Sequence, residues 1–161
     1  MRKTLAMRFL EGKGVSYEAY TYPSDERSAE VVAKHIGVSP AQVFKTLVVV
    51  RDYGKPLLVM IPANRQLDLK KTAKALGEKK VKLASHAEAE EMTRLQVGGI
   101  SPLALINRSF DVVVDQSAAS LDSLYMSAGE KGINLRVAMN DLMRLTRART
   151  LDVTSEDEPE D

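Results

Sequence analysis

The residue with the clearest potential for chemistry lies at the start of an apolar run, FKTLVVV, residues 44–50. Side-chain alternation along a strand places Lys45 on the same face as Leu47 and Val49, with Phe44 on the opposite face. A lysine in this position can cover apolar surface with its aliphatic stem and keep its ammonium in water. It can equally lie at a pocket mouth and hold a phosphate or a carbonyl oxygen under attack. The strand pattern alone leaves both interpretations open.

A second candidate is the segment VGGISP, residues 97–102. Gly98 and Gly99 allow backbone conformations closed to other residues and let amide N–H groups approach a ligand closely. The proline that follows favours an extended conformation at Ser101. A plain loop between a helix and a strand explains the same residues. The segment MSAGEKG, residues 126–132, offers similar small residues at a strand end and is a weak motif by itself.

Most enzyme signatures are absent from the sequence. It contains no cysteine, which excludes a thiolate nucleophile, disulfides and cysteine-ligated metal sites. The two histidines, His35 and His86, have neither metal-ligand spacing nor a Gly-x-Ser-x-Gly partner. No phosphate-binding loop or dinucleotide fingerprint occurs. We therefore expect no metal and no organic cofactor, and any catalysis would depend on few protein groups.

The charge distribution suits an anionic partner. The net charge is +1, but five of the last six residues are acidic. Without these six residues, basic side chains outnumber acidic ones by six. Six lysines and one acid gather in LKKTAKALGEKKVK, residues 69–82. This segment is either a solvated helix surface or a phosphate-binding surface, with Lys70, Lys71 and Lys74 as the candidate phosphate contacts.

The elements that must position these residues alternate irregularly between helices and strands. Periodicity and capping residues predict helices within residues 4–14, 28–37, 67–77, 85–93 and 139–147, and a helical turn at 39–43. Strand patterns occupy residues 16–22, 46–50, 57–63, 80–84, 110–117, 123–129, 134–138 and 149–153. The turn at 51–56 predicts an antiparallel hairpin. This order indicates an α+β fold with a mixed, mostly antiparallel and partly barrel-like sheet flanked by helices.

The chain length fits one domain, which we expect over residues 1–153. Residues 154–161 are expected to form an acidic, disordered tail, because they are too polar to pack. The sequence contains neither the apolar run of a signal peptide nor that of a membrane span. We therefore expect a cytoplasmic protein without a membrane partner. The sequence does not predict an oligomeric state.

Five segments together resemble the YbaK/EbsC family: VFKTLVV, QLDLKKTAKALGEKKV, VGGISPL, LYMSAGEKG and AMNDLMRL. They follow the order and approximate spacing seen in that family, and the resemblance covers about residues 4–153. Its members are free-standing relatives of the editing domain of prolyl-tRNA synthetase. The resemblance implies hydrolysis in trans of the ester of mischarged tRNA(Pro), with cysteinyl-tRNA(Pro) as the expected substrate and prolyl-tRNA synthetase as a docking partner. In this family the substrate's thiol or a ribose hydroxyl supplies much of the chemistry, so the protein mainly positions the ester.

The resemblance also implies roles for individual residues. Lys45 matches the family's pocket lysine and would contact the terminal nucleotide or the ester. The implied catalytic set is Lys45, Gly98, Gly99, Ile100 and Ser101. The implied substrate-binding set is Tyr22, Phe44, Ser127, Gly129 and Asn134.

Two departures from the family pattern leave alternatives open. The loop SAGEKG has Ala128 for a glycine and Glu130 for a lysine, and Asn134 stands where an aspartate is expected. An amide hydrogen-bonds but cannot act as a general base. These changes favour a rival in which the same fold binds an aminoacyl or nucleotide group without turnover. A deacylase for alanyl-tRNA or another small amino acid is a third interpretation.

Overall fold

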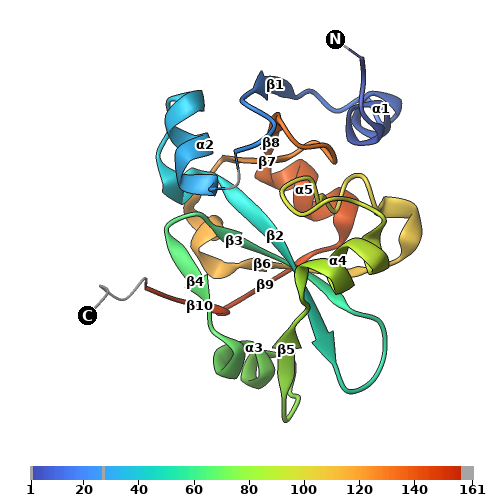
Figure 1. Cartoon of the computed structure of the whole chain (residues 1–161), viewed down its shortest axis with the longest axis vertical. Coiled ribbons are helices and arrows are strands. Elements are labelled where there is room, and N and C mark those ends of the chain that lie inside the picture. The colour runs from blue at the N-terminus through green and yellow to red at the C-terminus, as the bar shows by residue number, and fades with distance from the viewer. Residues whose placement is uncertain (1, 27, 157–161) are drawn as a thin grey trace.

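The computed structural model describes residues 2–26 and 28–156 (Figure 1). Its α-helices are α1 (Leu5–Gly12), α2 (Ala29–Ile36), α3 (Leu69–Leu76), α4 (His86–Thr93) and α5 (Met139–Thr146). Its strands are β1 (Glu18–Thr21), β2 (Phe44–Arg51), β3 (Leu57–Pro62), β4 (Arg65–Leu67), β5 (Val81–Leu83), β6 (Asp111–Asp115), β7 (Ser123–Ser127), β8 (Ile133–Ala138), β9 (Arg149–Leu151) and β10 (Thr154–Glu156). Short 3-10 helices are η1 (Pro40–Gln42), η2 (Ile106–Arg108) and η3 (Gln116–Ser120).

The strands form three sheets. The central sheet has the order β5-β2-β3-β6-β9, a second sheet has the order β1-β8-β7, and β10 pairs with β4. Pairing is antiparallel except at β3–β6 and β6–β9. The predicted α+β fold with a mixed, mostly antiparallel sheet is confirmed. The barrel-like closure is not found, because β5 and β9 remain edges of the central sheet.

Strand β2 is covered on both faces, as its alternation predicts. Phe44 and Val48 lie in the main hydrophobic core, whereas Val49 and Leu47 pack in a second cluster together with residues of β3 and α3. Lys45 is opposite Ile61 of β3 in the antiparallel register. It shares the face of the second cluster but lies at the strand's start, where its side chain remains exposed. The fold therefore presents a lysine at the edge of a buried surface.

Capping residues define the predicted helix ends. The Ser28 side chain accepts a hydrogen bond from the first turn of α2, and Gly37 ends that helix with a left-handed φ of 88°. Ser85 and Glu88 form the predicted capping box of α4. Every helix in the described part of the chain is too short or too polar to cross a lipid bilayer.

The C-terminal strand β10 changes the expected domain boundary. Its three residues belong to the segment expected to be a disordered tail, but they pair with β4. Thr154 is 1% exposed and accepts a hydrogen bond from Arg65, so backbone pairing and this polar contact order a segment with little apolar surface. Residues 157–161 of the expected tail lie outside the described residues.

Candidate functional site

A small cavity of about 120 Å³ lies between α2, the start of β2 and the loop before η2. Seven of the ten predicted catalytic and substrate-binding residues line it: Tyr22, Phe44, Lys45, Gly98, Ile100, Ser127 and Asn134. Its apolar wall is formed by Ala29, Val32, Val43, Leu47 and Val97. Residues that are far apart in the sequence therefore meet in one pocket, which combines an apolar wall with a few polar groups.

Lys45 lies at the mouth of this small cavity. Its side chain is exposed, and it also lines a second, polar cavity of about 260 Å³. Among the described residues, no carboxylate forms an ion pair with Lys45. The ammonium is therefore available to a ligand that enters either cavity.

Asn134 and Tyr22 form the polar side of the small cavity. Asn134 is 4% exposed, and its Oδ1 has no hydrogen-bond partner in the structure. Burial raises the pKa of Tyr22, although hydrogen bonds from the Gly132 backbone and the Asn134 side chain act in the opposite direction. The phenol is therefore neutral around pH 7. A buried carbonyl oxygen without a donor is costly, and it indicates a place for a ligand's N–H, O–H or S–H group.

The two glycines of the VGGISP loop have different surroundings. Gly98 has a φ of +94° and lines the small cavity. Neither its N–H nor that of Ile100 donates a hydrogen bond within the described residues. The Gly99 N–H, by contrast, donates to the Gln96 carbonyl at 2.7 Å. Within this loop, the amides of Gly98 and Ile100 therefore lack a hydrogen-bond partner among the described residues, whereas that of Gly99 is used.

The structure does not bring Gly99 and Ser101 into the small cavity. A Cβ on Gly99 would lie 3.1 Å from the backbone of Glu130 and of Lys131, so this glycine allows two loops to pack backbone to backbone. Ser101 is fully buried, and its Oγ accepts a hydrogen bond from the Leu103 N–H at 3.2 Å. Both residues shape the loop rather than line the cavity.

Ser127 and Gly129 come from the loop after β7. Ser127 is paired with Asn134 in the β7–β8 register and lines the small cavity. Its Oγ accepts a hydrogen bond from the Gly129 N–H at 3.2 Å. Gly129 has a φ of +95° and faces Ala104, where a Cβ would approach to 2.8 Å. The absence of a side chain at Gly129 therefore lets this loop pack closely on Ala104.

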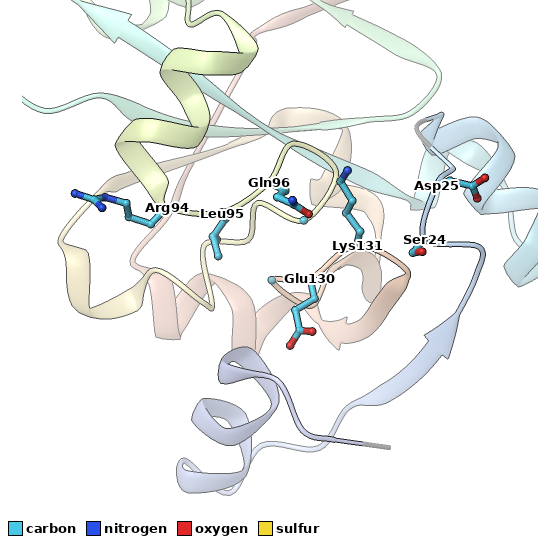
Figure 2. Close-up of a pocket in the computed structure, with 9 residues that line it drawn as sticks. Ser24, Asp25, Arg94, Leu95, Gln96, Glu130 and Lys131 are labelled. Atoms are coloured by element: carbon cyan, nitrogen blue, oxygen red, sulfur yellow. The ribbon is translucent and has the colours of Figure 1, made fainter.

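A larger cavity of about 670 Å³ lies on the other side of these two loops (Figure 2). Gly99 and Gly129 line it, together with Lys131. Figure 2 shows Lys131 extending toward Gln96, whereas Glu130 points the opposite way. Glu130 forms an ion pair with Arg2 at 2.8 Å. The acidic residue in the SAGEKG loop therefore lines the larger cavity and not the small one.

The predicted tRNA-binding lysines lie apart from the small cavity. Lys70, Lys71 and Lys74 are all exposed on α3, which lies at the opposite end of the β4–β10 pair from α2 (Figure 1). Lys71 donates to the Thr154 carbonyl at 3.0 Å and lies 3.5 Å from Asp152. Lys70 and Lys74 form no ion pair within the part of the chain that the structure describes.

The sequence reading missed the contribution of α2 and β4. Ala29 and Val32 form part of the apolar wall, and Arg65 lines the polar cavity next to Lys45. The apolar face of α2 was a sign that this helix packs on another element. No pattern in the sequence indicates that Val32 and Ala33 of this helix pack with Val43, Ala63 and Tyr125, because these contacts depend on tertiary packing.

Solved structures identify the class of fold. A crystal structure of a protein described only as hypothetical matches with a TM-score of 0.85 and 26% identity, over 94% of this chain and 99% of that chain. A crystal structure of "a putative trans-editing enzyme for prolyl tRNA synthetase" has the same fold, with a TM-score of 0.82 and 24% identity over 96% of this chain and 99% of that chain. The fold is therefore that of a known class of small α+β proteins.

The sequence profile of the aminoacyl-tRNA editing domain matches residues 24–145, and the chain belongs to this family. A relative from Enterococcus faecalis, "Putative Cys-tRNA(Pro)/Cys-tRNA(Cys) deacylase EbsC", is 34% identical over 158 residues, which cover 97% of this chain and 96% of the relative. A proline–tRNA ligase from Bacillus cereus is 24% identical over 110 residues, which cover 68% of this chain and 19% of the ligase. The resemblance to the YbaK/EbsC family is confirmed.

Proposed function

We propose that this protein is a trans-editing hydrolase that cleaves the ester of mischarged aminoacyl-tRNA, with cysteinyl-tRNA(Pro) as the substrate. The family membership and the near full-length match to a relative named as a deacylase support this activity. The observation that carries the proposal is the meeting of Lys45, Asn134 and the free amides of Gly98 and Ile100 around one small cavity.

The small cavity is proposed to hold the amino acid. Its volume of about 120 Å³ suits a small side chain, and its wall of aliphatic residues favours an apolar or weakly polar one. Discrimination between side chains that differ by one methylene is worth about 1–3 kcal/mol in such a pocket. A cavity of this size therefore favours cysteine or alanine over larger acyl groups.

The amides of Gly98 and Ile100 are proposed to stabilise the developing oxyanion. Attack on the ester carbonyl forms a tetrahedral intermediate whose oxygen becomes negatively charged. Fixed N–H donors and a nearby ammonium, that of Lys45, lower the energy of this charge, and one such donor is typically worth about 100- to 1,000-fold in rate. Collapse of the intermediate breaks the bond to the ribose oxygen and leaves the tRNA with a free hydroxyl.

The attacking group comes from the substrate or from water in this proposal. The cavity contains no histidine and no cysteine to act as a base or nucleophile. The substrate's own thiol is held next to the ester and gains a large advantage from proximity: it attacks the carbonyl, the bond to the ribose oxygen breaks, that oxygen takes up the thiol proton, and a thiolactone is released. A ribose hydroxyl can instead orient an attacking water, because its own attack would only move the acyl group along the ribose. Asn134 Oδ1 is proposed to accept a hydrogen bond from the substrate's amino group and thereby to orient the ester toward the amides.

The rival function is binding without turnover, which the neutral amide of Asn134 favours. The test is an assay of the purified protein with cysteinyl-, alanyl- and prolyl-tRNA(Pro). Rapid loss of the cysteinyl ester, with the prolyl ester intact, supports the proposal. Faster loss of the alanyl ester would identify alanyl-tRNA(Pro) as the substrate instead. Tight binding without hydrolysis would establish binding without turnover as the function.

Partners and location follow from the substrate. The protein is proposed to meet mischarged tRNA(Pro) in the cytoplasm and to dock on prolyl-tRNA synthetase, which would supply selection for that tRNA. Co-purification with the synthetase in the presence of tRNA(Pro) tests the docking. Recovery of neither tRNA nor synthetase would contradict it.

A further inference from the structure

The polar cavity beside the small cavity has a composition that suits an anion. Its volume is about 260 Å³, and it shares Lys45 and Ala29 with the small cavity. Its remaining lining residues are Ser28, Glu30, Ala63, Arg65 and Gln66. Lys45 therefore stands between a cavity with an apolar wall and one lined mainly by polar groups, two of which are cations.

Arg65 is held in place by the C-terminal strand. Its Nε donates to Thr154 Oγ1 at 2.6 Å, and its Nη2 lies 3.5 Å from the Thr154 carbonyl oxygen. Thr154 is 1% exposed, so these acceptors are fixed within the β4–β10 pair. The contacts orient the guanidinium and leave its other N–H groups unused.

Among the described residues, no carboxylate pairs with this guanidinium. Within residues 2–26 and 28–156, Arg65 takes part in no ion pair although its side chain is partly buried. Glu30, the acidic residue that lines the same cavity, is exposed on α2. A partly desolvated, oriented guanidinium without a counter-ion is a favourable site for a phosphate, which it contacts through paired N–H groups.

We propose that Arg65 binds the phosphodiester on the 5′ side of the 3′-terminal nucleotide of the tRNA, with Lys45 lying between this phosphate and the ester. This inference rests on the proposed function, which places the ester of that nucleotide in the small cavity. The ribose would then lie next to Lys45, and the first backbone phosphate would reach the polar cavity. Thr154 acts as a positioning residue, because it contacts Arg65 and not the substrate.

The β4–β10 pair also links Arg65 with the lysines of α3. Lys71 donates to the Thr154 carbonyl that also lies near Arg65, which connects the polar cavity with the first turn of α3. In Figure 1, β4 and β10 lie between α2 and α3. The proposed site therefore gives Lys70 and Lys74 a role as contacts for phosphates further along the single-stranded end.

The test compares a substrate with phosphates and one without. Arg65→Gln is assayed on cysteinyl-tRNA(Pro) and on 3′-O-cysteinyl-adenosine, beside Lys34→Gln, an exposed cation of α2 that lines neither cavity. We expect Arg65→Gln to raise KM for the tRNA about tenfold and to leave kcat for the tRNA unchanged. The rate at which the adenosine ester is hydrolysed should also stay unchanged. Loss of one phosphate contact also lowers the salt slope of binding by about 0.7. Thr154→Val should reproduce part of the KM effect, and Arg65→Lys should restore part of the affinity.

Equal losses on both substrates, or no effect on the tRNA, would overturn the phosphate site. If the wild-type protein hydrolyses neither substrate, the proposed function fails, and the phosphate site is tested separately by binding of uncharged tRNA(Pro). Weaker binding by Arg65→Gln than by Lys34→Gln then supports the site. Equal binding by both variants overturns it.

Discussion

The side chains of Tyr22 and Asn134 line the same small cavity, in which Asn134 Oδ1 is buried and has no hydrogen-bond partner. The two residues come from neighbouring strands, since Tyr22 directly follows β1 and Asn134 lies in β8. The Tyr22 N–H donates to the Gly132 carbonyl at 3.0 Å, which extends the pairing. Backbone pairing therefore fixes a pair of side chains that presents one unused acceptor to a ligand.

Replacing Asn134 tests this acceptor. Asn134→Leu keeps the branched shape of the side chain and removes the unpaired oxygen, so we expect about a tenfold rise in KM. Asn134→Asp keeps an acceptor for an amino group and should hold KM within about threefold. Steady-state kinetics measure both effects, and thermal unfolding verifies that both variants fold. An unchanged KM in Asn134→Leu would show that Oδ1 does not contact the substrate.

Gly99 is predicted to be essential for the loop that forms the small cavity. Gly99→Ala places a Cβ 3.1 Å from the backbone at Glu130 and Lys131, so one of the two loops must move. We expect a loss of about 1–3 kcal/mol in the free energy of unfolding and a lower kcat, because the Gly98 and Ile100 amides shift with the loop. Urea unfolding and deacylation rates measure the two effects.

Gly12→Ala is the matched control for Gly99→Ala. Gly12 lies at the end of α1 with open space around its Cβ position and without a left-handed φ. The substitution should leave activity unchanged and should keep or slightly raise stability, because alanine favours the helix. Equal stability losses in the two variants would contradict the loop-packing argument.

Local signals explain why much of the fold could be predicted. The alternation in residues 44–50 fixes the two faces of β2, and Ser28 and Ser85 are caps that act on adjacent backbone groups. Strands β4 and β10 could not be predicted, since RQL and TSE are short, polar and without alternation. Their pairing depends on each other and on contacts between distant side chains, such as Arg65 with Thr154.

The candidate site could be predicted only in part, because its details also depend on contacts between distant segments. Family resemblance brings Lys45, Asn134 and the VGGISP loop together, but it does not tell which amides of the loop face the cavity. The hydrogen bond from the Gly99 N–H to the Gln96 carbonyl uses one of these amides, and those of Gly98 and Ile100 have no partner among the described residues. The polar cavity was missed because Arg65 reaches it only through the pairing of β4 with β10.

The wall of the small cavity should control substrate selection. Val32 is 5% exposed and lines this cavity. Val32→Ala enlarges it, so we expect the ratio of prolyl- to cysteinyl-tRNA(Pro) hydrolysis to rise about tenfold. Val48→Ala removes the same groups from the main core, away from the cavity, and should lower stability without changing this ratio. A ratio that shifts equally in both variants would point to loosened packing instead.

Tyr17 should make stability depend on alkaline pH. Its hydroxyl donates to Glu11, and this hydrogen bond, together with burial, raises the pKa of Tyr17 to about 12 from its ordinary value of 10. The folded state thus holds the proton more tightly than the unfolded state, so the stabilisation is complete below pH 10 and is lost as pH rises toward 12. Thermal unfolding of wild type and Tyr17→Phe should show a difference in Tm that is constant near neutral pH and shrinks above pH 10. A difference that grows with pH would contradict the assignment.

The most direct test of the account is the rate at which Lys45→Met hydrolyses cysteinyl-tRNA(Pro), measured beside wild type and Lys34→Met. Lys45 is exposed, so the folded structure should survive the substitution, and circular dichroism and Tm verify this. The account predicts that kcat/KM falls at least about 100-fold in Lys45→Met and stays at the wild-type value in Lys34→Met. A folded Lys45→Met protein that removes the cysteinyl ester as fast as wild type would contradict it.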